Sequence, residues 1–275
     1  NELPFDIITV TFLKDFESSM KGLHQNTVYE HFKNFKAALN QAIDEEMIRA
    51  DQNPFIRFKV DNVPTHKEKL TEDEIRRLKA LKLDPATTLG HTLNCFLFAF
   101  YCGGIRAGDL ITLRWENIED GNLTYVMSKT RKKKLIKKSV PLMPETLEIL
   151  HNYERPGLSS SDFIFGMLDN KISKLIDREK KFRSGHEAKI FNQIASRNTI
   201  LNKNLKKIAV LAEITKPLTF HIARHSFAQY ALDRDMNPKI LQAILGHEKF
   251  ATTENYISTL NNRKVEDAMI EIFKN

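Results

Sequence analysis

The sequence predicts a mainly helical protein of the α+β class: a small helical N-terminal domain, then a larger, mainly helical domain with a small antiparallel β-sheet. The chain has 275 residues, enough for two compact units at about 150 residues per domain. Only 10 residues are Gly and 9 are Pro, which favours helices. Several segments carry apolar residues at helical spacing, and one region carries the alternating pattern of strands. With 41% hydrophobic and 28% charged residues, the composition excludes a disordered or fibrous chain.

Two helices are predicted near the N-terminus. The first covers residues 11–20. The second covers residues 26–50, because apolar side chains recur along it at spacings of three and four. The dipeptide Asn53-Pro54 then ends the element, since the residue before proline disfavours helical geometry. The apolar positions of the second helix are Val28, Phe32, Phe35, Leu39, Ala42, Ile43 and Met47.

A linker is predicted after these helices. Residues 55–69 are rich in charges, are interrupted by Pro64 and have no apolar periodicity, which is typical of an interdomain segment. We therefore assign residues 1–60 to the first domain, residues 61–69 to the linker and residues 70–275 to the second domain.

The second domain opens with a strong helix start. Thr71 and Glu74 have the spacing of a capping box, and Leu70 is placed to contact Ile75 as a hydrophobic staple.

A buried helix is predicted for residues 91–102, which are apolar nearly all round. Gly103 and Gly104 then break it. Arg106 is therefore expected on a turn or at the start of a new helix.

A β-hairpin is predicted next. Residues 122–129 and 135–142 carry β-branched and aromatic side chains with partial alternation. The loop between them is strongly basic, because seven of the ten residues 129–138 are Lys or Arg. Such a stripe on a hairpin tip suits phosphate contacts.

The remainder is predicted as helices separated by breaks. Thr219 can cap a helix over residues 221–232. The Asn-Pro pair 237–238 provides an N-cap and first position for a helix over residues 239–245, which stops at Gly246. The other expected helices cover residues 145–153, 169–180 and 199–211, a short segment around Tyr256, and residues 262–273.

Charge, cysteine usage and hydropathy limit the functional classes. The net charge of +7 and a pI near 9.2 favour an anionic partner such as nucleic acid. Cys95 and Cys102 are seven residues apart, about 10 Å along a helix, which is too far for a disulfide; two buried thiols fit a reducing cytoplasm. No apolar run reaches the roughly 18 residues of a membrane span, and no secretory signal is visible.

Four short stretches combine groups that can act on a phosphodiester. They are GGIRAGDL (103–110), SKT (128–130), HIARH (221–225) and LGHEKFATTENY (245–256). In order and spacing they resemble the tyrosine recombinases, also called the phage integrase family. The resemblance is specific because an Arg turn, a hairpin Lys, an H-x-x-R-H helix, an L-G-H turn and a Tyr nine residues later must coincide. It covers residues 70–275, and the preceding helices resemble the end of the family's SAM-like core-binding domain.

The resemblance implies a six-residue catalytic set: Arg106, Lys129, His221, Arg224, His247 and Tyr256. Attack on a phosphodiester places charge on its non-bridging oxygens, and the guanidinium forks of Arg106 and Arg224 suit those oxygens. Tyr256 would be the nucleophile that forms a 3′-phosphotyrosyl intermediate. The alternative for Arg106 is an ordinary salt bridge with Asp109, and the alternative for Tyr256 is a packed aromatic.

Proton transfer completes the expected chemistry. His221 is a plausible acid or base for the nucleophile, and His247 is expected to donate a hydrogen bond to the phosphate. Lys129 matches the family's acid for the departing 5′ oxygen, although Lys132 or Lys133 could serve instead. The basic residues expected to contact DNA phosphates are Arg131, Lys132, Lys133 and Lys134.

No cofactor or metal is expected. The phosphotyrosyl bond retains the energy of the broken phosphodiester, and the sequence has neither a phosphate-binding G-x-x-x-x-G-K-[ST] loop nor an acidic cluster suited to Mg²⁺. His225 is assigned to packing or helix orientation. Zinc binding by His221, His225 and His247 is the alternative, which the neighbouring arginines oppose.

The resemblance therefore implies a site-specific DNA recombinase that is a monomer when free and acts as a homotetramer on double-stranded DNA. The rivals are a type IB topoisomerase and a non-catalytic DNA-binding protein on the same fold. Residues 262–275 are expected to form a helix that docks on a neighbour or on its own protomer. Two departures from the family stand out: Ile222 and Ala223 replace the usual Asp and Leu, and no glycine precedes Lys129. The N-terminal domain is also shorter than usual, which suggests truncation.

Overall fold

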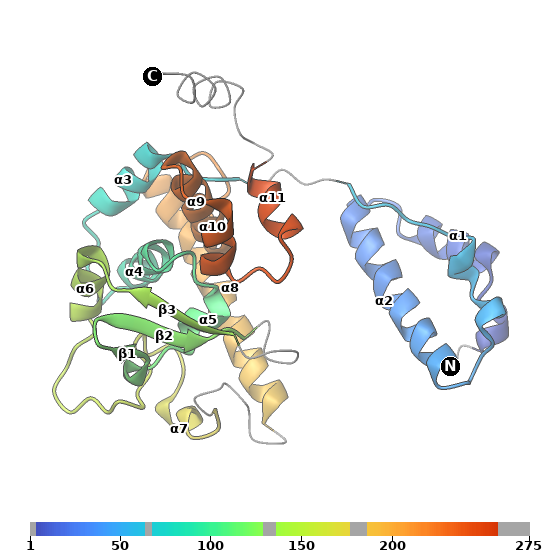
Figure 1. Cartoon of the computed structure of the whole chain (residues 1–275), viewed down its shortest axis with the longest axis horizontal. Helices are drawn as coiled ribbons and strands as arrows, with labels where there is room; N and C mark the ends of the chain where they lie inside the picture. The colour runs from blue at the N-terminus through green and yellow to red at the C-terminus, as the bar shows by residue number, and fades with distance from the viewer. Residues whose placement is uncertain (1–3, 64–67, 129–135, 177–185, 258–275) are drawn as a thin grey trace, which may run out of the picture. The chain divides into compact units, whose positions relative to one another are not determined.

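The computed structural model describes the chain except for residues 1–3, 64–67, 129–135, 177–185 and 258–275 (Figure 1). The chain divides into two compact units, Asn1–His66 and Lys67–Asn275. Each unit has its own hydrophobic core.

The smaller unit is built on two helices, α1 (Val10–Ser19) and α2 (Gln25–Asp44). The Thr9 side chain caps α1 by accepting from the backbone N–H of Phe12. Both predicted helices are confirmed, and phenylalanine rings pack between them, for example Phe16 against Phe32 with ring centroids 5.5 Å apart. The buried apolar side chains of this core are Ile8, Leu13, Met20, Val28, Phe32, Leu39, Phe55 and Phe58.

Two predictions for this unit are wrong. The second helix ends at Asp44 rather than at residue 50, because Glu46 adopts a left-handed backbone (φ 59°) and the N–H of Met47 turns back to the carbonyl of Ala42. This arrangement is a Schellman-type helix end, and it leaves Met47 exposed instead of in the core.

The segment that begins at residue 55 is not a linker throughout. Phe55 and Phe58 are buried in the core of the smaller unit. Asn53 caps the short 3-10 helix Pro54–Ile56, which carries Phe55 inward. The start of this segment lacks helical periodicity because it is irregular, and it still packs into the core of the smaller unit.

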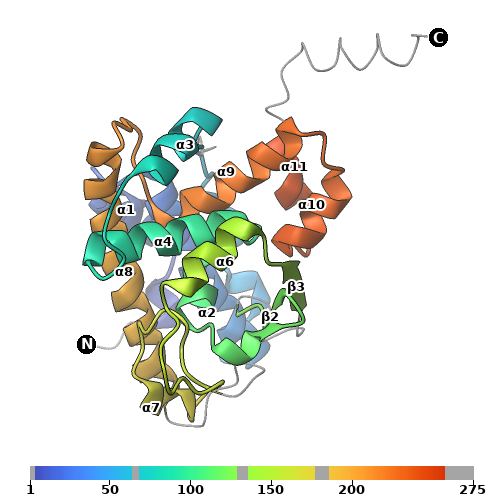
Figure 2. The same cartoon turned by 90° about the vertical axis from the view of Figure 1, so that its left-hand side faces the viewer.

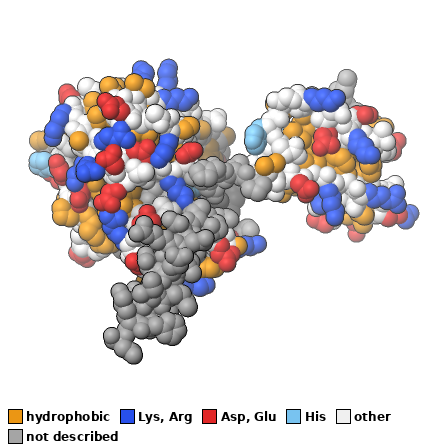
Figure 3. Space-filling model, turned by 90° about the horizontal axis from the view of Figure 1, so that it is seen from above, with side chains coloured by type: hydrophobic (Ala, Val, Ile, Leu, Met, Phe, Trp, Pro, Cys, Tyr) orange, Lys and Arg blue, Asp and Glu red, His pale blue; other side chains and the backbone are white. Residues whose placement is uncertain are grey.

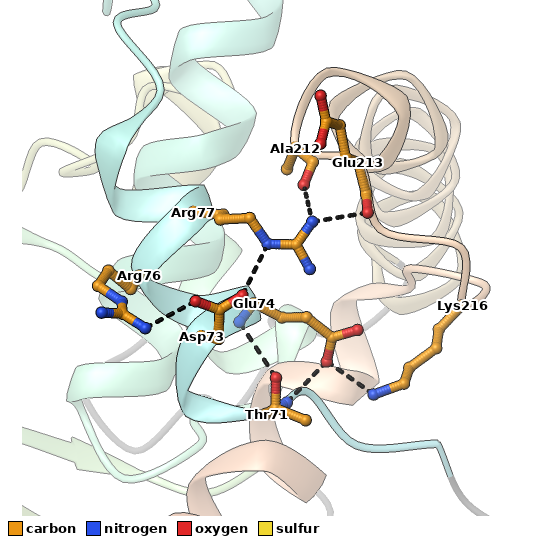
Figure 4. Close-up of polar contacts among 8 residues, drawn as sticks. All are labelled: Thr71, Asp73, Glu74, Arg76, Arg77, Ala212, Glu213 and Lys216. Carbon is orange, nitrogen blue, oxygen red and sulfur yellow. Dashed lines mark hydrogen bonds and ion pairs between the residues drawn. The ribbon is translucent and has the colours of Figure 1, made fainter.

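The larger unit starts as the sequence predicts. Helix α3 (Glu72–Ala80) has a complete capping box between Thr71 and Glu74. The Glu74 carboxylate also lies 2.6 Å from Lys216 Nζ, and Arg77 donates to the carbonyls of Ala212 and Glu213 (Figure 4). These contacts fasten α3 to the turn that precedes the helix of the H-x-x-R-H motif.

Helix α4 (Thr88–Tyr101) lies at the centre of this unit. It packs against α6 (Pro144–His151), α8 (Glu187–Leu211) and α9 (Phe220–Asp233), as Figures 1 and 2 show. Most of its side chains are buried, which agrees with the prediction of a helix that is apolar all round. Cys95 and Cys102 are buried free thiols.

The predicted hairpin is confirmed and belongs to a three-stranded antiparallel sheet in the order β1-β2-β3. Its strands are β1 (Ile118–Glu119), β2 (Asn122–Val126) and β3 (Lys137–Pro141). The two-residue β1 was not predicted, because so short an edge strand carries no alternation of its own. In the β2–β3 register, Tyr125 pairs with Lys138.

The other helices differ from the sequence prediction mainly in length. Helix α8 begins at Glu187, twelve residues before residue 199. In the segment 169–180, the described part is helical only in α7 (Asn170–Ser173). The predicted helix at 262–273 lies outside the described residues.

The C-terminal turns follow their local signals. Helix α10 (Pro238–Leu245) is capped by Asn237 and ends at Gly246, which is left-handed as predicted. Helix α11 (Ala251–Ile257) contains Tyr256. Thr219 occupies the N-cap position of α9, but its side chain makes no capping hydrogen bond, so that detail of the prediction is wrong.

The described helices and one face of the larger unit bear on the expectations from hydropathy and charge. None of the helices in the described ranges is both long and apolar enough to cross a bilayer. On the face of the larger unit shown in Figure 3, acidic and basic side chains are interspersed. Among its described residues, the face in Figure 3 therefore carries no continuous basic patch.

Candidate active site

The turn that carries Arg106 is shaped by close contact with α9. Gly104 has a left-handed backbone (φ 70°), and a Cβ added there would lie 2.8 Å from Arg224 Cα. Only glycine fits such an approach without displacement. The chain then enters the short helix α5 (Ala107–Ile111), with Arg106 at its N-cap. Two segments that are far apart in sequence thus bring Arg106 and Arg224 together.

Arg224 is fixed by backbone carbonyls on two sides. It is 4% exposed. Its Nη1 donates to the carbonyl of Gly104 at 2.9 Å, and its Nη2 donates to the carbonyl of Leu245. These bonds tie the end of α4 and the end of α10 to one guanidinium group, so the position of Arg224 depends on both turns.

The phenol of Tyr256 meets a histidine that sequence reasoning assigned to packing. Tyr256 Oη lies 2.8 Å from His225 Nδ1, and both side chains are buried. His221 is exposed, and its ring packs edge-on against that of His225 with centroids 4.4 Å apart. In this structure, His225 rather than His221 is therefore within hydrogen-bond distance of the predicted nucleophile.

His247 links the L-G-H turn to the same centre. Its Nε2 lies 3.1 Å from Arg224 Nη2, and its Nδ1 lies 3.0 Å from Thr253 Oγ1. Because a guanidinium can only donate, this arrangement requires Nε2 to accept and therefore a neutral ring protonated at Nδ1. The ring also stacks on Tyr256, with centroids 6.1 Å apart.

A pocket opens beside the two arginines. It has a volume of about 400 Å³ and is lined by Arg106, His221 and Arg224 together with Asn198 and Asn202 of α8. Within the described ranges, Arg106 Nη1 is buried and has no hydrogen-bond partner. An unpaired guanidinium nitrogen on a residue that lines a pocket is a candidate donor for an anion.

Asp109 does not neutralise Arg106 through an ion pair between described residues. It is 1% exposed, and its Oδ1 accepts from the backbone N–H and the hydroxyl of Ser128 at 2.9 and 2.7 Å. This contact anchors the end of the β2 strand segment to α5. Ser128 directly precedes Lys129, so the anchor sets where the basic loop begins.

Burial and mutual repulsion shift the pKa values of the central groups. Burial, and then the nearby Arg106, lower the pKa of Arg224 to about 10, so it remains cationic at neutral pH. Burial raises the pKa of the Tyr256 phenol, whereas Arg224 and Arg106 act in the opposite direction. The positive charges of the arginines therefore stabilise a phenolate and partly offset the effect of burial.

The structure brings five of the six predicted catalytic residues into one region, and the other predicted site residues lie outside the described ranges. Arg106, His221 and Arg224 share a pocket, and His247 and Tyr256 contact the groups around Arg224. The predicted residues that lie outside the described ranges are Lys129, Arg131, Lys132, Lys133 and Lys134. Their roles stay predictions.

The proximity of His225 to Tyr256 had a signal in the sequence. His225, Ala228 and Leu232 are spaced at i, i+3 and i+7, so they share one face of α9. Ala228 and Leu232 pack with Leu241, Leu245 and Tyr256 in a small core between α9, α10 and α11. A histidine on the same face is therefore directed toward the helix that carries the tyrosine.

Among the described residues, no group of three or more His, Cys, Asp or Glu side chains is arranged to hold a metal ion. The site gathers the two arginines and three histidines around the phenol of Tyr256. Such a cluster can bind an anion and can pass a proton to or from the phenol.

Two family models match the chain. The model of the phage integrase family matches residues 68–263, and the model of the phage integrase SAM-like domain matches residues 1–60. Together they account for both units.

Individual relatives agree with these matches. The chain is 25% identical over 267 residues to tyrosine recombinase XerD of Vibrio cholerae, covering 96% of this chain and 81% of the relative. It is 23% identical over 228 residues to a tyrosine recombinase of Pseudothermotoga lettingae, covering 81% of this chain but only 65% of the relative. In fold it is similar to the integrase of transposon Tn1549 in complex with circular intermediate DNA, with a TM-score of 0.61, 18% identity and coverage of 97% and 86% of the two chains.

Proposed function

Because the chain belongs to the phage integrase family of tyrosine recombinases, we propose that it cuts and rejoins DNA at specific sites through a covalent bond between Tyr256 and a DNA 3′ phosphate. The observation that carries the proposal is the 2.8 Å contact between Tyr256 Oη and His225 Nδ1 beside the buried Arg224. A packed structural tyrosine needs neither a proton acceptor nor a buried cation next to it.

The proposed first step is attack by Tyr256 Oη on the phosphorus of the scissile phosphodiester. His225 Nδ1 takes the phenolic proton, in place of the His221 that the sequence alone favoured. The bond between phosphorus and the 5′ oxygen breaks, and that oxygen receives a proton, for which Lys129 remains the proposed donor. The product is a 3′-phosphotyrosyl bond and a free 5′ hydroxyl.

The arginines are proposed to hold the phosphate throughout this step. Arg106 offers its unpartnered Nη1, and Arg224 is held in place by the carbonyls of Gly104 and Leu245. Because both positions exist before the substrate binds, stabilisation of the charge that develops on the phosphate needs little rearrangement. His247 Nε2 accepts from Arg224 in this structure. To donate to the phosphate as expected, this nitrogen must release Arg224 and bind a proton.

Rejoining reverses the same steps with a 5′ hydroxyl as the nucleophile. The phosphotyrosyl bond conserves the energy of the original linkage, so neither a nucleotide nor a metal is required. When the entering 5′ hydroxyl belongs to another duplex, the outcome is strand exchange. We propose double-stranded DNA as the partner and, following the family, four copies of the chain on two duplexes as the active assembly.

The test uses a pool of nicked duplexes, in which loss of a short 5′ fragment traps the covalent product. The chain and its Tyr256→Phe variant are incubated with the pool, and the mixture is separated on a denaturing gel. We expect protein-linked DNA only with Tyr256, and sequencing of that DNA identifies the site. A second incubation with two marked duplexes then separates strand exchange from relaxation alone, the result expected of a topoisomerase.

A chain that binds the duplexes at low salt but forms no adduct would overturn the proposal and favour a DNA-binding protein. An adduct that persists in Tyr256→Phe would also overturn it, because the nucleophile would then be another residue. Tyr153→Phe serves as a matched control, since Tyr153 hydrogen-bonds to His91 in the same unit and neither residue lines the pocket beside the arginines.

A further inference from the structure

A lysine on strand β3 points into the larger unit. Lys138 is 8% exposed, whereas its strand neighbours Lys137 and Ser139 are exposed. This alternation is the normal pattern of a strand with one buried face. Yet lysine is almost never fully buried without a partner, and apolar residues occupy most inward positions of the sheet.

The side chain of Lys138 packs against the turn that positions His247. Gly246 is left-handed (φ 63°), and a Cβ added there would lie 3.0 Å from Lys138 Cε and would also collide with Met127 Sδ. Lys138 and His247 line one cavity of about 540 Å³. The hydrogen bond from Arg224 to His247 connects this cavity to the residues of the Arg106 pocket.

The surroundings of Lys138 are strongly cationic. Burial, then Arg224 and then Arg106, lower the pKa of its ammonium group to about 8. Tyr125 pairs with it across the sheet, and the other ionisable groups that line its cavity are Lys137, Lys239 and His247. In the described part of the chain, no Asp or Glu forms an ion pair with Lys138.

Three cations, Arg106, Lys138 and Arg224, thus lie in a region where Asp109 is the carboxylate that acts on Arg224, so positive charge is in excess there. Asp109 also accepts from Ser128, and its single charge does not balance three cations; Arg106 Nη1 is unpartnered among the described residues. Gathering buried like charges is costly unless an anion completes the arrangement. A phosphate bound between them would offset their repulsion.

We propose that Lys138 is a further phosphate ligand of this site, whose ammonium group contacts the same phosphodiester as Arg106 and Arg224. The inference rests on the proposed function for the identity of that phosphodiester as the scissile one. A lysine complements the two arginines, because a compact point charge can reach an oxygen that planar guanidinium forks leave free.

The first test compares DNA that has a charged phosphate at the cleavage position with DNA in which that charge is removed. In the Tyr256→Phe background, the affinity for the duplex identified by adduct sequencing is measured with a normal or a methylphosphonate linkage at the cleavage position. We expect Lys138→Met to weaken binding of the normal duplex about tenfold or more, as for loss of a charged hydrogen bond, and to change binding of the methylphosphonate duplex much less. Lys138→Arg should retain most of the affinity.

Lys137→Met is the matched control, since Lys137 is the exposed neighbour on the same strand. It should weaken both duplexes by the same small factor, because a general contribution to DNA attraction does not depend on one phosphate. Equal losses with both duplexes for Lys138→Met, or no loss at all, would overturn the proposal even if Tyr256 forms its adduct.

A second readout does not depend on cleavage. In the full chain with ¹³Cε-labelled lysines, the NMR signal that disappears in Lys138→Arg is titrated with and without inorganic phosphate. Phosphate should raise the midpoint of this titration, because a bound anion favours the charged ammonium group. An unchanged midpoint at high phosphate would contradict the ligand role, whereas absence of a Tyr256 adduct would contradict only the proposed function.

Discussion

The phenol of Tyr256 is the group on which the proposed chemistry depends. Burial raises its pKa, and the two arginines only partly oppose this effect. Ionisation in advance of attack is therefore unfavourable, and the proton must leave as the new bond forms. The residue that accepts it must lie within hydrogen-bond distance of Oη, a condition that His225 meets in this structure.

Replacement of His225 by alanine is expected to slow adduct formation about 100-fold or more, the usual contribution of a general base. His221→Ala should have a smaller effect on the rate, because His221 is exposed and contacts the ring of His225 instead of the phenol. The measurement is the single-turnover rate of covalent-complex formation on a nicked duplex. A larger loss with His221→Ala than with His225→Ala would return the role of base to His221.

Lys138 is expected to lower stability while it serves the site. Its pKa of about 8 in the folded chain lies below the value of about 10.4 for an unfolded lysine. The folded state therefore disfavours its charge, a cost that is fully present below pH 8 and disappears as the pH rises toward 10.4. Lys138→Met should raise the free energy of unfolding at pH 7 by about 1–3 kcal/mol, because the full shift at about 1.4 kcal/mol per pKa unit sets the upper limit and solvent screening reduces it.

Urea unfolding at pH 7 and pH 10 checks this expectation. The gain should shrink at the higher pH, and Lys137→Met should show no such gain because Lys137 is exposed. A destabilisation by Lys138→Met at both pH values would mean that the ammonium group is satisfied in the folded chain.

At the scale of helices and strands, two close approaches of the backbone shape the site. Gly104 lets the turn after α4 lie against Arg224, and Gly246 lets the turn after α10 lie against Met127 and Lys138. Both glycines lie beside groups of the site and not in the general core. The turns therefore position cations as well as ending helices.

Gly104→Ala should reduce adduct formation more than its effect on stability explains. The added Cβ would lie 2.8 Å from Arg224 Cα, so it must displace α9 or the turn. Gly121→Ala is the matched control, because Gly121 has a similar φ of 71° but nothing within 4 Å of an added Cβ. It carries only the backbone cost, about 1 kcal/mol. Equal activity of the two variants at equal stability would contradict this role of Gly104.

The elements that the sequence predicted well are those with local signals. The capping box of α3, the Asn-Pro start of α10 and the glycine that ends it all lie within a few residues of the helix ends they define. The extended start of α8 has no comparable mark, because its N-cap position is His186, whose side chain makes no capping bond. The sequence did not predict the end of α2 because the left-handed residue there is Glu46, whereas helices usually end at a left-handed Gly or Asn.

The site was predictable in its residue types and less so in its contacts. The motif of α9 places Arg224 and His221 on adjacent turns, but which histidine meets Tyr256 depends on how α10 and α11 fold back over α9. That return is set by long-range packing of Leu241 and Leu245 against Ala228. Lys138 escaped prediction for a similar reason: within a run of basic residues, only the register of β3 shows which one points inward.

At the scale of the whole molecule, the two separate cores indicate two units that fold independently. The phenylalanine-rich core of Asn1–His66 shares no residue with the core that surrounds α4. All described residues of the candidate site belong to the larger unit. The smaller unit can therefore contribute to DNA capture without supplying a reacting group.

Residues 67–275 produced alone are expected to unfold cooperatively and to retain Tyr256-dependent adduct formation. Their affinity for DNA should be lower than that of the whole chain, because phosphate contacts are lost with the first unit. Thermal unfolding, binding at several salt concentrations and the adduct assay test these points. Loss of cooperative unfolding would contradict independent folding, and undiminished affinity would remove the smaller unit from DNA capture.

The most direct test of the central claim is to locate the DNA on the protein. The trapped complex is digested with nuclease and trypsin, and the modified peptide is identified by mass spectrometry. Cleavage after Lys249 and Arg263 releases a peptide in which Tyr256 is the only tyrosine. We predict that the nucleotide remnant lies on this peptide, at Tyr256. A remnant on any other residue, or a trapped complex without a modified tyrosine, would contradict the assignment of the nucleophile.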